Sequence, residues 1–214
     1  MGTEPGLRER KKLRTRALIA ETARRLFSER GFEAVSVAEV ATEAEVSEAT
    51  VFNYFPTKED LVYYGMEAFE EELLDAIRRR PAGVSALDAF GAFVSRPRGF
   101  LAATDETVRE TLLAVTRMIA ASPALRARER QIFARYTESV ASLLRDETAA
   151  GPDDLRPWVV ASTLVGLHAT LIDFVRRRLL DGTPEISRLA RQLSREAEKA
   201  IGLLRGGLGD YAVK

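Results

Sequence analysis

One short segment of the chain has the composition of a surface that reads DNA bases. Glu48, Ala49 and Thr50 are small or short polar residues, and they follow Ser47, a residue type that often begins a helix. Side chains of this size let the start of a helix approach base edges in the major groove. The segment is therefore a candidate nucleic-acid interface, provided that the flanking sequence exposes it.

The flanking sequence predicts two short helices with a tight connection. Ser36 and Glu39 have the spacing of a capping box, which begins a helix over 36–44. A second helix is predicted over 47–55, and a long helix over about 11–30 precedes both. This is the helix-turn-helix arrangement, in which the second short helix enters the major groove. The same pattern also fits an αα-hairpin inside an ordinary helical bundle.

The rest of the chain also has helical periodicity, with Gly and Pro between the segments, so an all-α fold is expected. Further helices are predicted near 85–95, 105–121, 124–149, 155–180 and 185–205, and the Gly206–Gly207 tail is expected to fray. The predicted organisation is a helix-turn-helix domain over 1–57, a connecting helix over 58–80 and a larger C-terminal domain over 81–214.

The charges are balanced in total but segregated along the chain. Lys and Arg number 32, as do Asp and Glu. Residues 7–16 hold six basic residues and one acid, whereas residues 33–48 hold five acids and no base. Attraction to DNA phosphates must then come largely from the basic arm at 7–16. The alternative is that the arm is only a solvated terminus, and Arg78–Arg80 and Arg176–Arg178 are expected to be solvated helix ends.

Several kinds of chemistry are excluded or disfavoured. The chain has no Cys and one His, which excludes disulfides, thiol nucleophiles and metal sites built from several imidazoles. P-loop, G-x-S-x-G and H-E-x-x-H motifs are absent, so a helical enzyme is the weaker alternative, and no catalytic residue, metal or cofactor is expected. The longest apolar run, 158–172, is too short to span a membrane. A cytoplasmic protein without a membrane partner is expected.

Residues 44–61, AEVSEATVFNYFPTKEDL, closely resemble the signature of the TetR family of transcriptional regulators. The resemblance extends back to about residue 13, and beyond residue 61 only the helical layout is similar. It implies a ligand-responsive homodimeric repressor that binds a palindromic double-stranded DNA operator. A small hydrophobic or amphipathic effector would release it from that operator.

The resemblance also implies which residues contact DNA. Glu48, Ala49 and Thr50 occupy the base-reading positions, while Tyr54 and Lys58 match positions that contact the DNA backbone. With the basic arm included, the expected DNA-binding set is Ser36, Ser47, Glu48, Ala49, Thr50, Asn53, Tyr54, Lys58, Arg8, Lys11, Lys12 and Arg14.

Three residues depart from the family pattern. Glu45 replaces the usual turn glycine, which costs about 1 kcal/mol if the position needs a positive φ. Phe52 replaces the usual first tyrosine of an aromatic pair and is expected to be a core residue. Glu48 is acidic where a neutral or basic residue is common, although a carboxylate can accept a hydrogen bond from cytosine N4. These departures keep open a helical interaction module that has lost DNA binding.

For the C-terminal domain, the resemblance implies an effector pocket and a dimer interface formed by the last two helices. Expected pocket residues are Phe93, Leu112, Val115, Thr116, Ile119, Phe133, Tyr136, Trp158 and His168. Expected interface residues are Leu164, Leu171, Val175, Leu189, Leu193 and Ile201.

The basic arm generates a direct prediction. Deletion of residues 1–12 should weaken operator binding and flatten its salt dependence, because each phosphate that the arm no longer neutralises lowers the log–log salt slope by roughly 0.9. DNA titrations across a series of salt concentrations measure both quantities. An unchanged affinity together with an unchanged slope would contradict a role for the arm.

Overall fold

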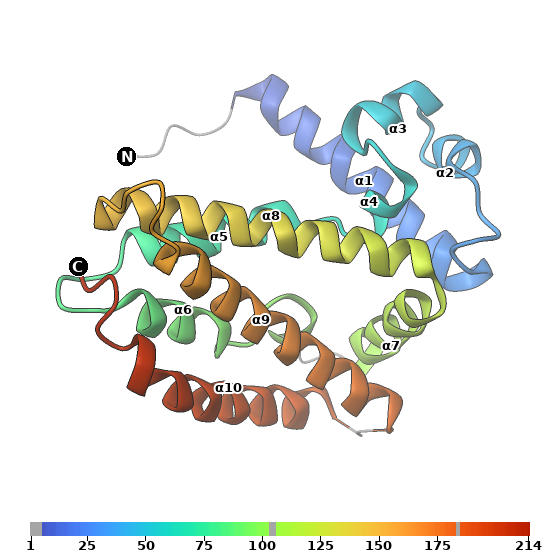
Figure 1. The fold of residues 1–214 in the computed structure, drawn as a ribbon. Helices are drawn as coiled ribbons and strands as arrows, with labels where there is room; N and C mark the ends of the chain where they lie inside the picture. The colour runs from blue at the N-terminus through green and yellow to red at the C-terminus, as the bar shows by residue number, and fades with distance from the viewer. Residues whose placement is uncertain (1–5, 103–105, 183–184) are drawn as a thin grey trace. The chain divides into compact units, whose positions relative to one another are not determined.

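The computed structural model describes residues 6–102, 106–182 and 185–214. Those residues form helices without any β-strand, which confirms the predicted all-α fold (Figure 1). In chain order the elements are α1 (Leu7–Arg30), α2 (Val37–Glu43), α3 (Glu48–Tyr54), α4 (Lys58–Val62), α5 (Met66–Arg78), α6 (Ala86–Val94), the 3₁₀ turn η1 (Gly99–Ala102), α7 (Glu106–Ala121), α8 (Pro123–Thr148), α9 (Arg156–Leu180) and α10 (Ile186–Leu208).

The chain divides into two compact units. The N-terminal unit comprises residues 1–64 together with 117–128, and the C-terminal unit comprises 65–116 and 129–214. The end of α7 and the start of α8 therefore belong to the N-terminal unit, although both helices continue into the other unit. The sequence pattern placed this segment in the C-terminal domain. Helical periodicity does not indicate which unit the end of a helix packs against.

The core of the N-terminal unit is built on one stripe of α1. Ile19, Ala23 and Phe27 recur at spacings of four residues, and all three are buried. The Phe27 ring meets the Phe32 ring edge-on, with 5.2 Å between the ring centres. This stripe packs α1 against α2 and α4, while α2 in turn packs against α3.

The connecting helix predicted over 58–80 is interrupted. Thr57 and Asp60 form a capping box that begins α4, but α4 ends at Val62 and α5 begins only at Met66. Gly65 has φ 95°, a left-handed conformation that ends the helical path and that glycine adopts without steric cost. The apolar spacing continues through the break, so periodicity alone did not reveal it.

An aromatic cluster joins four helices of the C-terminal unit, with Phe93 and Tyr136 buried and Phe69, Phe133 and His168 half-buried. The Phe69 ring of α5 stacks on the His168 imidazole of α9 at 4.6 Å and meets the Phe93 ring of α6 edge-on at 5.3 Å. Phe133 and Tyr136 of α8 complete the cluster, and the Tyr136 hydroxyl donates to the Met66 carbonyl. Burial lowers the pKa of His168 from 6.5 to about 4, because the interior disfavours the charged imidazolium.

Arg80 is a buried structural residue, which corrects the expectation that Arg78–Arg80 are solvated. Its guanidinium is 5 % exposed and donates to the carbonyls of Ile77 (2.5 Å), Val84 (3.1 Å) and Ala212 (2.8 Å). It also pairs with the Glu147 carboxylate at 2.7 Å. Arg80 therefore joins the end of α5, the loop before α6, the end of α8 and the C-terminal segment.

Arg176 also differs from the expectation, because its guanidinium forms a partly buried ion pair with Glu129 at 2.8 Å. The C-terminal segment does not fray as predicted either. Helix α10 continues through Gly206 and Gly207, and the Gly83 amide donates to the Lys214 carbonyl at 2.8 Å. These long-range partners are invisible to local sequence signals.

Among the described helices, α9 is long and apolar enough to cross a membrane. Its buried residues, however, contribute to the core of the C-terminal unit, where α9 packs against α6 and α10. The core helix of a folded domain passes the same composition test, so α9 is weak evidence for a membrane protein.

The contacts of Arg80 predict its contribution to stability. Arg80→Met should lower the free energy of unfolding by about 3–5 kcal/mol, because the Glu147 carboxylate and three carbonyls lose their donor. The matched control is Arg79→Met, since Arg79 is 79 % exposed and should change stability by less than about 0.5 kcal/mol. Denaturant unfolding measures both, and equal effects of the two variants would refute the structural role of Arg80.

The burial of His168 predicts a pH dependence. In the unfolded chain His168 takes up a proton near pH 6.5, whereas in the folded chain it does so only near pH 4. Stability should therefore fall as the pH drops through this window, by about 2 kcal/mol between pH 7 and pH 5 for this group. His168→Phe should remove this loss of stability. An equal fall in the free energy of unfolding between pH 7 and pH 5 in the two proteins would contradict the assignment.

Candidate nucleic-acid interface

The predicted helix-turn-helix is present in the N-terminal unit. Ser36 and Glu39 form the expected capping box, in which the Glu39 amide donates to Ser36 Oγ at 3.2 Å and the Ser36 amide donates to the Glu39 carboxylate at 2.8 Å. Ser47 caps α3 by accepting from the Thr50 amide at 3.1 Å. Between the two helices Glu45 has φ 54°, so this position does need the left-handed conformation that glycine usually supplies.

Helix α3 buries one face and exposes the other. Val51 is buried against the core of the N-terminal unit, whereas Glu48, Ala49 and Asn53 are exposed as expected for residues that contact DNA. Phe52 is also exposed, at 44 %, so the expectation that it is a core residue is wrong. Its position next to Val51 on a helix turns it away from the core, which makes it an apolar member of the outer face.

Thr50, Tyr54 and Lys58 are only partly exposed. The Thr50 hydroxyl lies 2.7 Å from Ser47 Oγ, so it takes part in the helix cap. The Lys58 ammonium donates to the Phe32 carbonyl at 2.6 Å and lies 4.3 Å from the centre of the Phe32 ring. Lys58 therefore connects the start of α4 to the turn after α1.

The basic arm is part of a helix. Helix α1 begins at Leu7, four residues before the predicted start, and the arm residues expected to contact DNA are exposed: Arg8, Lys11, Lys12 and Arg14. Arg16 differs, because its guanidinium lies 5.5 Å from the Phe55 ring centre and 5.7 Å from that of Tyr64. The exposed positive charges of the arm are thus carried on the part of helix α1 that precedes Arg16.

Two of the five acids over 33–48 pair with arginines of α1. Arg30 pairs with Glu39 at 2.6 Å, and Arg25 pairs with Glu43. Hydrogen bonds from Ser36 and Arg30 lower the pKa of Glu39 to about 2. Sequence reasoning missed these pairs, because their partners lie nine and 18 residues away in the chain.

The corner between α7 and α8 is a further part of the N-terminal unit that the sequence did not reveal. Ser122 donates its hydroxyl to the Glu33 carboxylate at 2.8 Å, and the Tyr63 hydroxyl donates to the Leu125 carbonyl at 2.8 Å. Arg128 pairs with Asp60 at 2.7 Å. The corner is therefore tied both to the turn before α2 and to α4.

The expected effector residues fall into two groups. Phe93, Phe133, Tyr136 and His168 come together in the aromatic cluster, to which Phe69 is an unpredicted addition. The remaining expected residues lie elsewhere: Leu112, Val115 and Thr116 are buried or half-buried on α7, Ile119 belongs to the N-terminal unit, and Trp158 is 43 % exposed and so is not part of a buried lining.

The residues expected at the dimer interface are buried within one subunit, and this corrects the expectation. Leu164, Leu171, Val175, Leu189, Leu193 and Ile201 are at most 7 % exposed within one chain. Side chains buried inside one subunit are not available to a second one. The apolar stripes of α9 and α10 thus pack the subunit itself, because a sequence pattern does not distinguish a core face from an interface face.

No group of three or more His, Asp or Glu side chains is arranged to hold a metal ion in the described part of the chain. The polar groups of the helix-turn-helix instead cap helices, form surface ion pairs or are exposed on the outer face of α3.

Comparison with known proteins identifies the same region. Residues 19–63 match the family described as bacterial regulatory proteins, tetR family. The chain is 33 % identical over 168 residues to the HTH-type transcriptional regulator TcmR of Streptomyces glaucescens, which covers 74 % of this chain and 71 % of TcmR.

Two solved structures share the fold over most of the chain. Salmonella enterica GusR has a TM-score of 0.53 at 20 % identity, covering 97 % of this chain and 98 % of GusR. NalD, the secondary repressor of the MexAB-OprM multidrug efflux pump in Pseudomonas aeruginosa, has a TM-score of 0.54 at 21 % identity, covering 87 % of this chain and 96 % of NalD. Together with the helix-turn-helix geometry and the match to TcmR, these findings show that the chain belongs to the TetR family of bacterial transcriptional regulators.

Proposed function

We propose that this regulator is a ligand-responsive homodimeric repressor that leaves its operator when a small hydrophobic or amphipathic effector binds. Its role is non-catalytic, and it acts on DNA in the cytoplasm. The observation that carries the proposal is the exposed outer face of α3, with Glu48, Ala49, Phe52 and Asn53 free for contact with DNA.

The outer face of α3 suits direct reading of bases. Ala49 and Phe52 can make apolar contact with thymine methyl groups, and Asn53 can pair with an adenine edge. Glu48 can accept a hydrogen bond from cytosine N4. Because α3 itself contains no basic residue, the helical arm of α1 supplies the attraction to phosphates.

A homodimer is proposed because one recognition helix contacts only a half-site, and two half-sites require two copies of the chain. Helices α9 and α10 remain the proposed interface, through side chains other than the buried ones. On α9 the exposed small residues Ser162, Gly166 and Thr170 recur every four residues. A Cβ atom added at Gly166 would meet nothing within 4 Å, so a second helix could approach closely there.

The response to an effector is proposed as a shift between two conformers. An effector that binds the DNA-incompetent conformer more tightly by a few kcal/mol moves the population off the operator. Helices α7 and α8 are suited to transmit this change, since each runs from the C-terminal unit into the corner that Ser122, Tyr63 and Arg128 tie to the DNA-binding unit.

Gel-shift titration with the DNA that flanks the chain's own gene tests the proposal. Thr50→Ala should weaken specific binding by about 1–2 kcal/mol, with little effect on non-specific DNA, because Thr50 lies in the base-reading segment. Lys58→Ala should weaken binding to all sequences and lower the salt slope by roughly 0.9 if Lys58 turns to a phosphate in the complex.

The matched control is Arg145→Ala, which removes one exposed positive charge from the part of α8 in the C-terminal unit and should bind as the unaltered chain does. Thermal unfolding separates the two roles of Lys58, because removal of its interaction with Phe32 alone would lower stability and leave the salt slope unchanged. Failure to shift any promoter fragment would instead favour an interaction module that has lost DNA binding.

A further inference from the structure

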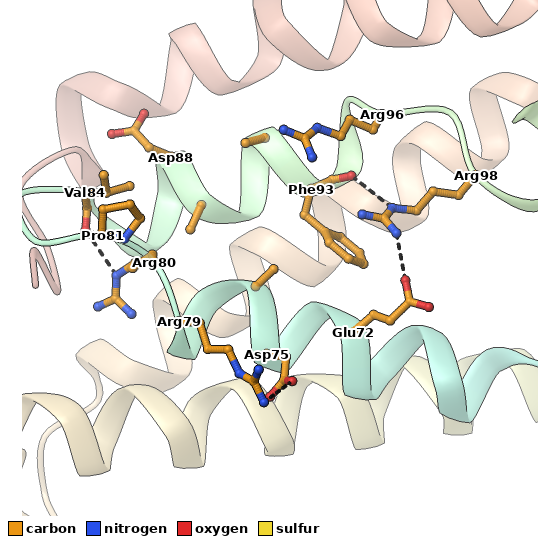
Figure 2. A pocket seen from close by; sticks show the side chains of 13 residues that line it. Glu72, Asp75, Arg79, Arg80, Pro81, Val84, Asp88, Phe93, Arg96 and Arg98 are labelled. Carbon is orange, nitrogen blue, oxygen red and sulfur yellow. Dashed lines mark hydrogen bonds and ion pairs between the residues drawn. The ribbon is translucent and has the colours of Figure 1, made fainter. Parts of the chain in front are cut away.

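We propose that the groove between α5 and α6 binds an organic anion, meaning a ligand with an apolar body and one anionic group. The proposal rests on the proposed function, because it names the chemical class of effector that the C-terminal unit takes. Figure 2 shows the groove, which has a volume of about 550 Å³ and is lined entirely by residues of the C-terminal unit. This volume lies within the range of small-molecule sites.

The floor of the groove is apolar. Ala89, Ala92 and Phe93 of α6 line it together with Ala76 of α5 and with Val84. The alanines leave room between the two helices, and the Phe93 side chain points from α6 toward α5 (Figure 2). A flat or slender apolar body would therefore bury its surface here, at a gain roughly proportional to the area removed from water.

Three acidic residues line the groove: Glu72 pairs with Arg98, and Asp75 and Asp88 are paired with other arginines. Asp75 binds Arg78 at 2.8 Å and Arg79 at 3.1 Å. Asp88 accepts from Ser85 at 2.9 Å and from Arg205 at 2.9 Å, and these hydrogen bonds lower its pKa. Neither carboxylate is left to attract a cationic ligand.

The cationic groups are not all paired. Arg96 is exposed and has no hydrogen-bond or ion-pair partner among the described residues. Arg98, which also lines the groove, lies with its guanidinium carbon 3.8 Å from the centre of the Phe93 ring and pairs with the exposed Glu72 carboxylate at 2.7 Å (Figure 2). Exposed ion pairs contribute little, so an incoming anion can replace Glu72 on Arg98 and also bind Arg96.

The position of Phe93 connects the groove to the interior. The same ring that forms part of the groove floor contacts Phe69, which stacks on His168 of α9. A ligand pressed against Phe93 therefore acts on a cluster that joins α5, α6, α8 and α9. This gives an anion in the groove a physical route to change the packing of the C-terminal unit.

Fluorescence titration of the full chain without DNA tests the site with two matched probes. 8-Anilinonaphthalene-1-sulfonate carries an apolar aromatic body and one anionic group, and N-phenyl-1-naphthylamine has nearly the same body without the charge. Arg96→Gln and Arg98→Gln should each raise the Kd of the sulfonate about tenfold, because each removes one charged hydrogen bond. The Kd of the neutral probe should not change.

Two control variants test whether the probes bind in the α5–α6 groove. Arg191→Gln removes one exposed positive charge from α10 and should leave both Kd values unchanged. Ala92→Trp fills the groove from an exposed position and should weaken both probes, with circular dichroism confirming that the helices are retained. The proposal is overturned if the sulfonate binds equally well to the unaltered chain and to both arginine variants, or if Ala92→Trp leaves both probes unaffected.

A gel shift of the same preparations separates this proposal from the proposed function. If the chain shifts DNA, and the Kd of the sulfonate is the same with and without the two arginines, the anion site alone is overturned. Arginine-dependent binding by a chain that shifts no DNA supports the anion site and contradicts the DNA-binding role. Release of the DNA by the sulfonate in the unaltered chain, but not in Arg96→Gln, supports both.

Discussion

The tight turn between α2 and α3 is the constraint on which the DNA-reading surface depends. Glu45 adopts φ 54° there, a conformation that costs a residue with a side chain about 1 kcal/mol. The turn lets Val51 enter the core while Glu48 and Phe52 face outward. The buried contacts of α3 with α2, together with the Ser47 cap, offset the cost of the turn.

Electrostatics then decide how a chain with no net charge can approach a polyanion. Ion pairs from Arg25 and Arg30 of α1 neutralise two acids of α2, so repulsion of phosphates by the helix-turn-helix is smaller than its composition suggests. The same helix extends from Leu7 and carries the exposed basic residues of the arm. One helix thus both pairs with two acids of α2 and carries the exposed basic residues, and the net charge of zero describes neither local field.

In the C-terminal unit, polar groups tie the helices together and aromatic groups fill the space between them. The buried Arg80 satisfies three carbonyls and the Glu147 carboxylate, and so fixes the segments that meet at the end of α5. Phe93 belongs both to the aromatic cluster and to the floor of the α5–α6 groove. The proposed effector site and the core of the unit therefore share a side chain, which suits a domain whose packing must respond to a ligand.

The sequence by itself determined the all-helical fold, the capping box at Ser36 and the two short helices α2 and α3, because caps, turns and helical periodicity act over three or four residues. Only the tertiary structure decided which apolar faces are core and which are surface. Leu164 and Leu189 proved to be core and Phe52 surface, although each is a large apolar residue in a predicted helix. Tertiary structure also decided the break at Gly65, the burial of Arg80 and the pairing of Arg30 with Glu39, since each depends on contacts or backbone geometry that residue spacing does not encode.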